Sequence, residues 1–274
     1  MVKLICLDID GTLLDPELNI SRENREAIRL AQEHGIAVTL ATGRMFASAL
    51  IYARELKLDV PLVTMNGALI KHPFTQAKLH ELRLGRRELG EVIAKITSAG
   101  YQPNFYDEFN LYAGSGLQRY YDNRILASLD PRYRIVEMGG EFSYQDLMDR
   151  YGDQVLKGIF FPSLEDKEPL RAALQEIGSI AVVSSAPTNL EITHHEADKG
   201  RGIRLLGESM GISPEEIMLI GDSENDRTML EAAGYSVAMG NASASIQAAA
   251  KFVTLDNTQH GVARAIRDIA LGGL

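Results

Sequence analysis

The sequence predicts an α/β protein in which a parallel sheet is interrupted by a second, inserted unit. Apolar runs of strand length alternate with helix-spaced segments from residue 2 to about residue 65, which is typical of β-α-β units. From about residue 79 the strands are more aromatic and follow one another more closely, as in an α+β unit. The alternation returns towards the C-terminus. We therefore expect residues 1–82 and 188–274 to form one domain and residues 83–187 to form the inserted one.

The first part of the parallel domain begins with Val2–Leu7, an apolar run that has the composition of a buried strand. Ser21 suits the N-cap of the helix that follows, and Gly35 suits its end. The next predicted elements are a strand at Ile36–Ala41, a helix at Met45–Leu58 and a strand at Leu62–Met65, closed by Asn66-Gly67. This order predicts parallel strands joined by crossover helices.

The inserted unit is expected to group helices between paired strands. Helices are predicted at Arg87–Ser98, Leu117–Leu129, Ser143–Asp149 and Leu164–Ile177, and strands at Gln102–Tyr106, Asn110–Ala113, Val155–Phe161 and Ile180–Ser184. Its aromatic residues, such as Phe105 and Tyr112, are expected to form mostly its core, with a substrate-facing surface as the alternative. No Gly/Ser linker marks the borders, so the change of pattern alone places them.

The last part of the chain resumes the parallel pattern. Leu190–Thr193 leads to Asp198-Lys199-Gly200 and a helix through Met210. Further expected elements are a strand at Ile217–Ile220, a helix to Ala233, strands at Ser236–Met239 and Phe252–Leu255, and a helix at Val262–Leu271. The parallel domain is therefore split in sequence by the inserted unit.

Composition narrows the class of protein. The chain has 274 residues and a net charge of -9, so its surface disfavours nucleic acid and anionic membranes as partners. The single cysteine, Cys6, allows no internal disulfide, which fits a reducing compartment. No apolar run reaches the roughly 18 residues of a membrane span, and Val2 already begins a strand, which leaves no room for a signal peptide. We expect a cytoplasmic protein; the sequence does not indicate its oligomeric state.

Asp8 and Asp10 follow the first strand with one residue between them, and Gly11 then lets the chain turn. Ligands of open parallel sheets bind at the carboxyl ends of the strands, so both carboxylates are expected at that crevice. A fixed carboxylate can act as a nucleophile, and a second one beside it can move protons. The alternative is a polar turn that merely closes the strand.

Other strands also end in polar groups, namely Thr42-Gly43, Lys199 and the set Asp222, Asn225 and Asp226. Carboxylates gathered at one edge repel each other, by about 4 kcal/mol for two unit charges ~4 Å apart at an effective dielectric of 20. A hard divalent cation such as Mg²⁺ suits oxygen ligands and commonly shares itself with a substrate phosphate, whereas no thiolate site is available for zinc. The loop at Asp222–Asp226 could instead simply cap the next helix.

Lys199 stands in the first turn of a predicted helix, where a positive charge opposes the helix dipole. The placement is explained if a phosphate occupies that helix start, with a solvated surface lysine as the alternative. Thr42 and the Gly43 N–H group could hold a phosphate oxygen, or Thr42 could cap the helix after it. His194-His195-Glu196 lacks the spacing of a zinc motif and is interpreted as a solvated loop.

Together these residues resemble the haloacid dehalogenase-like superfamily of phosphohydrolases, in its Cof-type branch with a large α/β (C2-type) cap. The motifs stand in order: DIDGT at Asp8–Thr12, ATGR at Ala41–Arg44, NGA at Asn66–Ala68, DKG at Asp198–Gly200 and GDSEND at Gly221–Asp226. The resemblance implies a Rossmann-like core of three α/β/α layers and a cap domain inserted between the ATGR and DKG motifs.

The resemblance also implies roles for individual residues. Asp8 would be the nucleophile and a Mg²⁺ ligand, and Asp10 the general acid/base, whose backbone carbonyl also binds Mg²⁺. Asp222 would be the other main metal ligand, with Asp226 just outside the coordination sphere. The phosphoryl group would be held by the Ile9 N–H group, Thr42, Gly43, Lys199 and Asn225.

These roles predict a Mg²⁺-dependent phosphatase that hydrolyses small phosphorylated metabolites, sugar phosphates in particular, through an aspartyl-phosphate. Asp10 favours ester hydrolysis, since the ATPases of the resembling superfamily carry threonine there. A phosphomutase and a phosphate-ligand sensor without turnover are the alternatives. The sequence does not distinguish sugar phosphates from nucleotides, flavin or pyridoxal phosphate, nor does it indicate which cap residues select among them.

Overall fold

The computed structural model describes residues 1–114, 128–139 and 141–272, which divide into two compact units. The first unit contains Met1–Arg44, Ala49–His80 and Asp198–Leu274. The second unit contains Met45–Ser48 and Glu81–Ala197. The second unit is thus inserted, in sequence, into the first.

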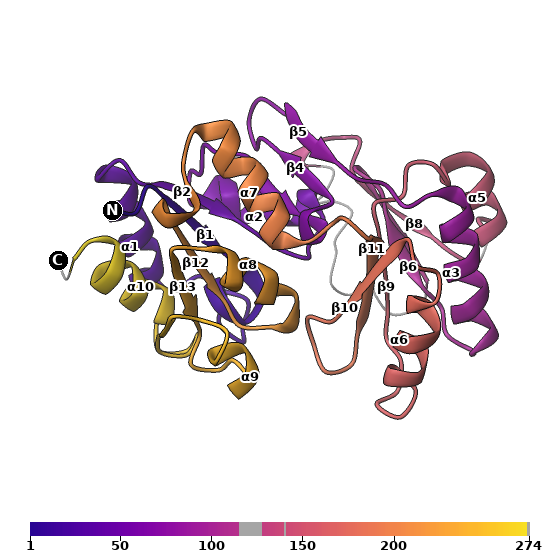
Figure 1. Ribbon diagram of the computed structural model, residues 1–274. Coiled ribbons are helices and arrows are strands. Elements are labelled where there is room, and N and C mark those ends of the chain that lie inside the picture. The colour runs from indigo at the N-terminus through magenta and orange to yellow at the C-terminus, as the bar shows by residue number, and fades with distance from the viewer. Residues whose placement is uncertain (115–127, 140, 273–274) are drawn as a thin grey trace. The chain divides into compact units, whose positions relative to one another are not determined.

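The first unit is built on a parallel sheet with the strand order β14-β13-β12-β1-β2 (Figure 1). Its strands are β1 (Leu4–Leu7), β2 (Ala37–Leu40), β12 (Ile217–Gly221), β13 (Tyr235–Ala238) and β14 (Phe252–Val253). Strand β1 lies inside the sheet and pairs with β12 on one side and with β2 on the other, so Leu4 lies opposite both Ile217 and Ala37. This arrangement confirms the predicted α/β class, and it brings the ends of β1 and β12 together.

Helices cover both faces of this sheet. They are α1 (Arg22–Glu33), α2 (Phe46–Glu55), α7 (Lys199–Met210), α8 (Arg227–Ala232), α9 (Ala244–Gln247) and α10 (Gly261–Ala265), which continues as a π-helical turn to Ala270. Helices α1 and α10 lie side by side on one face, and α7 and α8 lie on the other (Figure 1). The Ser21 side chain caps α1 by accepting a hydrogen bond from the Asn24 N–H group, as predicted.

The buried strands explain how α7 and α8 are held. Leu4 and Cys6, which alternate along β1, belong to one apolar cluster with Ile203 of α7 and Met229 and Leu230 of α8. Each fully buried side chain of this size contributes about 1.5–3 kcal/mol relative to exposure. The cluster therefore fixes the starts of α7 and α8 against the sheet edge where the acidic residues lie.

Strand β3 (Leu62–Thr64) only partly matches the prediction. It joins β2 in the parallel direction through the bridge Ala41–Val63, but it forms its main ladder in a second sheet with the order β3-β4-β5. In that sheet β3 runs antiparallel to β4 (Leu69–Lys71), and β5 (Lys78–Glu81) lies at the edge. The sequence did not predict β4 or β5, because Asn66 and Gly67, with φ of 56° and 90°, form a tight reversal rather than the end of a strand.

The second unit packs helices on a larger sheet with the order β10-β11-β9-β6-β7-β8. The strands are β6 (Asn104–Tyr106), β7 (Asn110–Ala113), β8 (Arg134–Glu137), β9 (Lys157–Phe160), β10 (Ile180–Val183) and β11 (Leu190–His194), and the helices are α3 (Arg86–Ser98), α5 (Tyr144–Tyr151) and α6 (Lys167–Gln175). Phe105, Tyr112 and Phe160 are buried in its core with Leu89 and Val92 of α3. The aromatic residues Phe105 and Tyr112 are thus core residues, as expected.

The second unit differs from the prediction in the place of strand β11 and in an additional strand, β8. Strand β11 was expected to lead into the last part of the parallel domain, but it pairs antiparallel with β9 and β10. The second unit therefore extends to Ala197, and the border near residue 188 was placed too early because an apolar strand does not reveal its partner. The predicted helix Leu117–Leu129 falls mostly outside the described residues, and strand β8 was not predicted.

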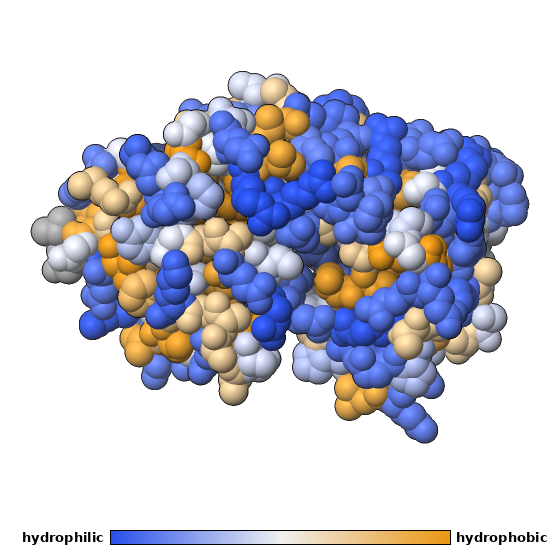
Figure 2. Space-filling view, in the orientation of Figure 1, coloured by the Kyte–Doolittle hydropathy of each residue, from blue (hydrophilic) through white to orange (hydrophobic). Residues whose placement is uncertain are grey.

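Hydrophilic residues cover most of the face seen in Figure 2, with smaller apolar areas among them. Among the helices of the described ranges, none combines the length and apolar character needed to cross a bilayer.

Candidate active site

The first acidic turn begins where β1 ends. Asp8 follows the strand directly, and the chain then makes a single wide turn at Ile9–Leu13, closed by a hydrogen bond from the Leu14 N–H group to the Ile9 carbonyl at 3.0 Å. Gly11 has φ of 77°, and a Cβ atom there would lie 2.5 Å from Asp222 Oδ2. Glycine is required at this position both by its backbone conformation and by the close approach of Asp222.

The second acidic turn follows β12. Asp226 folds back beneath the strand end, where its Oδ2 accepts hydrogen bonds from the N–H groups of Asp222 and Ser223 at 2.9 and 3.0 Å. Gly221 leaves the space for it, since a Cβ atom there would lie 2.6 Å from Asp226 Cγ. The Asp226 side chain is fully buried and held in one orientation.

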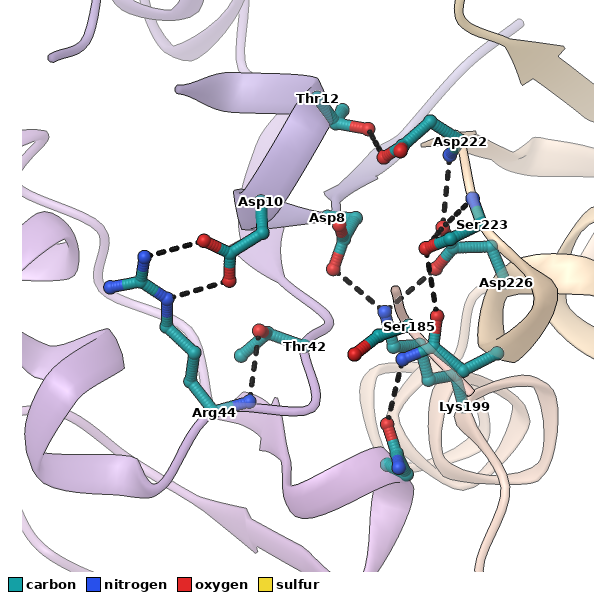
Figure 3. A network of polar contacts seen from close by, with 12 residues as sticks. Asp8, Asp10, Thr12, Thr42, Arg44, Ser185, Lys199, Asp222, Ser223 and Asp226 are labelled. Carbon is teal, nitrogen blue, oxygen red and sulfur yellow. Dashed lines mark hydrogen bonds and ion pairs between the residues drawn. The ribbon is translucent and has the colours of Figure 1, made fainter. Parts of the chain in front are cut away.

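Lys199 connects the two turns at the first position of α7. Its Nζ donates hydrogen bonds to Asp8 Oδ1 and to Asp226 Oδ1, both at 2.7 Å (Figure 3). Burial lowers the pKa of Lys199, but the two carboxylates outweigh burial and raise the pKa above its ordinary value. The side chain is therefore a buried ammonium ion, and the surface-lysine alternative is excluded by its full burial.

Asp8, Asp222 and Asp226 form an oxygen-lined cluster in which one carboxylate oxygen of each lies within 4.8 Å of the others. Burial raises the pKa of Asp8 well above its ordinary value, although Lys199 opposes this, and burial raises the pKa of Asp222 to about 7. Thr12 orients Asp222 by donating a hydrogen bond from Oγ1 to Oδ1 at 2.7 Å. Since one ammonium cannot balance three carboxylates, this donor set fits a hard divalent cation.

Asp10 stands apart from that cluster, and its side chain points towards Arg44 rather than towards Lys199 (Figure 3). Arg44 donates from Nε to Asp10 Oδ2 at 2.7 Å and from Nη2 to Oδ1 at 2.6 Å. Arg44 itself is held by Tyr52 of α2, whose hydroxyl accepts from Nη1 at 3.2 Å while the guanidinium lies 5.2 Å from the ring centroid. The sequence placed Arg44 in a motif but gave it no role.

The remaining predicted residues occupy the same group of loops. Thr42 is buried after β2, and its Oγ1 accepts a hydrogen bond from the Arg44 N–H group at 3.1 Å. Asn225, in the turn after β12, donates from Nδ2 to Asn66 Oδ1 at 3.0 Å. Asn66 thus orients Asn225. The sequence did not indicate this pairing, because the two residues are 159 positions apart. Ile9 is buried next to Asp8, and Gly43 lies between Thr42 and Arg44.

The histidine segment behaves differently. His194 and His195 lie at the end of β11 in the second unit, with ring centroids 4.4 Å apart. Within the described ranges, the residue group with spacing suited to a metal ion is the acidic cluster, and it does not include this segment. The loop interpretation from the sequence holds for His195 and Glu196, which form an exposed turn, but it is wrong for His194, which ends β11 and pairs with Ile180.

A comparison with known proteins gives concordant results. A family model described as haloacid dehalogenase-like hydrolase matches residues 5–266. The phosphatase YwpJ of Bacillus subtilis is 30% identical over 298 residues, covering 98% of this chain and 100% of that protein. The 5-amino-6-(5-phospho-D-ribitylamino)uracil phosphatase YwtE of the same organism is 31% identical over 299 residues, with 99% of both chains covered. A haloacid dehalogenase-like hydrolase structure from B. subtilis matches with a TM-score of 0.85 at 28% identity, covering 98% of this chain and 100% of that one.

Proposed function

Because this chain belongs to the haloacid dehalogenase-like hydrolases, we propose that it is a Mg²⁺-dependent phosphatase acting on small phosphorylated metabolites through an aspartyl-phosphate on Asp8. The observation that carries the proposal is the pair of hydrogen bonds from Lys199 to Asp8 and Asp226. A buried ammonium beside a carboxylate at the end of β1 suits a site where phosphoryl oxygens collect negative charge.

In the first half-reaction, a carboxylate oxygen of Asp8 attacks phosphorus and the bond from phosphorus to the substrate oxygen breaks. For this step Asp10 must be protonated, with Arg44 withdrawn from one of its oxygens; it then donates that proton to the substrate oxygen, so that the product leaves as an alcohol. In the second half-reaction, Asp10 accepts a proton from water, which attacks phosphorus and releases Asp8 and inorganic phosphate. The Asp10 side chain is 53% exposed, so a leaving group and water can both reach it.

The proposed phosphoryl site combines the Ile9 N–H group, Thr42, Gly43, Lys199 and Asn225. Their support lies in placement: these residues follow β1, β2 and β12 or begin α7. Loop N–H groups and a helix start both favour a phosphate. Asn66 keeps the amide of Asn225 in place for this contact.

Asp8, Asp222 and the backbone carbonyl of Asp10 are the groups that would hold Mg²⁺. When bound, Mg²⁺ would neutralise the carboxylates and polarise a phosphoryl oxygen. Asp226 is proposed to stay outside the coordination sphere, because Lys199 and two N–H groups already occupy its oxygens. Its role would be to orient Lys199.

The second unit is proposed as the cap that selects the substrate, with the first unit as the catalytic core. The YwtE relative is named for a substrate whose phosphate is carried by a ribityl chain. Phosphorylated sugars and polyols are therefore the class that we propose first, in a protein that acts in the cytoplasm without nucleic acid or membrane partners.

The test is a survey of kcat/KM over phosphorylated sugars, polyols, nucleotides and cofactors in the presence of Mg²⁺, with Asp8→Asn as a control for contaminating phosphatases. We expect release of inorganic phosphate from sugar or polyol phosphates by the wild-type protein alone. Formation of an isomeric phosphate without phosphate release would instead identify a phosphomutase. Binding without turnover across the whole panel would identify a sensor.

A further inference from the structure

We propose that Asn241 is a positioning residue for Asp10, which it places by holding the turn after β1. The inference rests on the proposed function, in which Asp10 transfers protons. The Asn241 Nδ2 group donates a hydrogen bond to the carbonyl oxygen of Gly11 at 2.9 Å. Asn241 comes from the loop after β13, 230 residues away in sequence, so the contact joins two separate strand ends.

The turn around Asp10 depends on contacts such as this one. The Asp10 side chain is half exposed; Arg44 orients its carboxylate, and the turn after β1 places the backbone from which it extends. Gly11, the next residue, has φ of 77°, and a Cβ atom at this position would lie 2.5 Å from Asp222 Oδ2. Thr12 is tied to Asp222 at 2.7 Å. The bond from Asn241 fixes the peptide between Gly11 and Thr12, one residue beyond the peptide that joins Asp10 to Gly11.

Asn241 is itself held from behind. The Asn257 N–H group donates to Asn241 Oδ1 at 3.1 Å, and Asn257 Nδ2 donates to the Leu14 carbonyl at 2.8 Å. Two residues before Asn241, the Met239 N–H group donates to the Gly221 carbonyl at 3.0 Å. The loop after β13 therefore links the turn after β1 to the end of β12, which carries Asp222.

Loss of the hydrogen bond from Asn241 to Gly11 should affect the rate of proton transfer by Asp10 rather than the stability of the fold. A general acid must lie within hydrogen-bond reach of the leaving oxygen, and a misplacement of about 1 Å can cost about 100-fold in rate. Asn241 is exposed and Gly11 is partly exposed, so water can replace the lost hydrogen bond without leaving a buried group unpaired. Loss of the Asn241 amide should thus displace Asp10 while the sheet stays folded.

Two aryl phosphates separate this role from general damage to the site. Phenyl phosphate releases a strongly basic phenolate that needs a proton, whereas p-nitrophenyl phosphate releases a stabilised anion that needs little help. Both carry the same phosphate on a ring, so metal binding, Lys199 and the Asp8 nucleophile serve them alike. Displacement of Asp10 should therefore lower kcat/KM more for phenyl phosphate than for p-nitrophenyl phosphate. The parameter kcat/KM is suited to this comparison because it reports the steps up to cleavage of the ester bond.

The experiment measures kcat/KM for both substrates with wild-type protein, Asn241→Ala, Asn241→Asp and the control Asn19→Ala. Asn19 is exposed and lies in the segment that follows the same turn, but its hydrogen bonds are to Asp15 and Glu17. For both Asn241 variants we expect the kcat/KM for p-nitrophenyl phosphate, divided by the kcat/KM for phenyl phosphate, to rise about tenfold. This is part of the roughly 10²–10⁴-fold that general acid catalysis supplies. The control should keep the wild-type ratio.

Asn241→Asp keeps the shape of the side chain and the oxygen that accepts from Asn257, but it removes the donor to the Gly11 carbonyl. It therefore tests the loss of that donor if Asn241→Ala does not fold. An equal loss on both substrates, or no loss, would overturn the inference while leaving the phosphatase proposal intact. Failure of both variants to fold would also overturn it, since Asn241 would then be a structural residue. Wild-type protein that hydrolyses neither these substrates nor any phosphate ester of the metabolite panel would instead refute the proposed function.

Discussion

The guanidinium of Arg44 binds both carboxylate oxygens of Asp10, at 2.6 and 2.7 Å. Such a paired contact fixes the plane of the carboxylate as well as its distance. Tyr52 holds the same guanidinium through its hydroxyl and its ring. The orientation of Asp10 is therefore determined by a side chain from the neighbouring loop and not by its own turn alone.

Arg44→Ala should lower kcat/KM at least about tenfold, since a carboxylate without its partner samples orientations that are not suited to proton transfer. Arg44→Lys should recover only part of the loss, because an ammonium cannot make the paired contact. Steady-state kinetics on the best substrate measures both. Arg29→Ala, which breaks an exposed pair with Glu33, is the matched control and should leave kcat/KM unchanged. Wild-type kinetics in Arg44→Ala would contradict this prediction.

Asp8→Asn should abolish turnover and preserve the fold, because the amide has the shape of the carboxylate but cannot attack phosphorus. Lys199 keeps Asp226 as a partner in this variant, so some phosphate binding should remain. Phosphate release and calorimetric titration with inorganic phosphate measure the two properties. Substantial residual activity would remove Asp8 from the role of nucleophile.

Lys199→Met should lose both activity and stability. Removal of the ammonium leaves Asp8 and Asp226 buried without their shared partner, and breaking a buried pair in this way typically costs about 3–5 kcal/mol. Denaturant unfolding in the presence of a chelator measures the change without a contribution from metal. An unchanged kcat/KM would exclude Lys199 from the site.

Gly11→Ala and Gly35→Ala form a matched pair, since both glycines have φ of 77°. The backbone cost of alanine, about 1–2 kcal/mol, should be similar in both variants. Only at Gly11 would the new Cβ lie 2.5 Å from an Asp222 oxygen, whereas nothing lies within 4 Å at Gly35. We expect a larger fall in Tm for Gly11→Ala, because the clash adds to the backbone cost, and loss of activity in that variant alone. Equal activities in the two variants would show that the approach of Asp222 is not needed for catalysis.

Removal of divalent metal should abolish hydrolysis, and added Mg²⁺ should restore it, because the cluster of Asp8, Asp222 and Asp226 lacks the positive charge to balance it. Mg²⁺ at a concentration of about 100 times its Kd should also raise the free energy of unfolding by about 2.7 kcal/mol. Activity with and without a chelator, together with Tm as a function of Mg²⁺ concentration, measures both effects. Full activity in excess chelator would contradict the metal proposal.

Much of the fold could be predicted because its signals are local. Ser21 caps α1, and the strands that precede Asp8 and Asp222 are buried runs ended by polar turns. The β3–β4 reversal and the membership of β11 could not be predicted, since an apolar strand is compatible with more than one neighbour.

The site shows the same division. The acids and Lys199 were identified from motifs, whereas the partners that orient them were not. Arg44 is 34 residues from Asp10, Asn66 is 159 from Asn225, and Asn241 is 230 from Gly11. Such side-chain pairings depend on how strand ends meet in space, and one sequence contains no signal of that meeting.

The position of β1 between β12 and β2 also has a consequence for biosynthesis. Asp8 leaves the ribosome early, but its partner Lys199 follows 191 residues later, after the entire second unit has been made. At about 5–20 residues per second, roughly 10–40 s separate the two. During that interval the nascent N-terminal strand lacks its β12 neighbour, so it is a segment that chaperones would be expected to shield until translation nears its end.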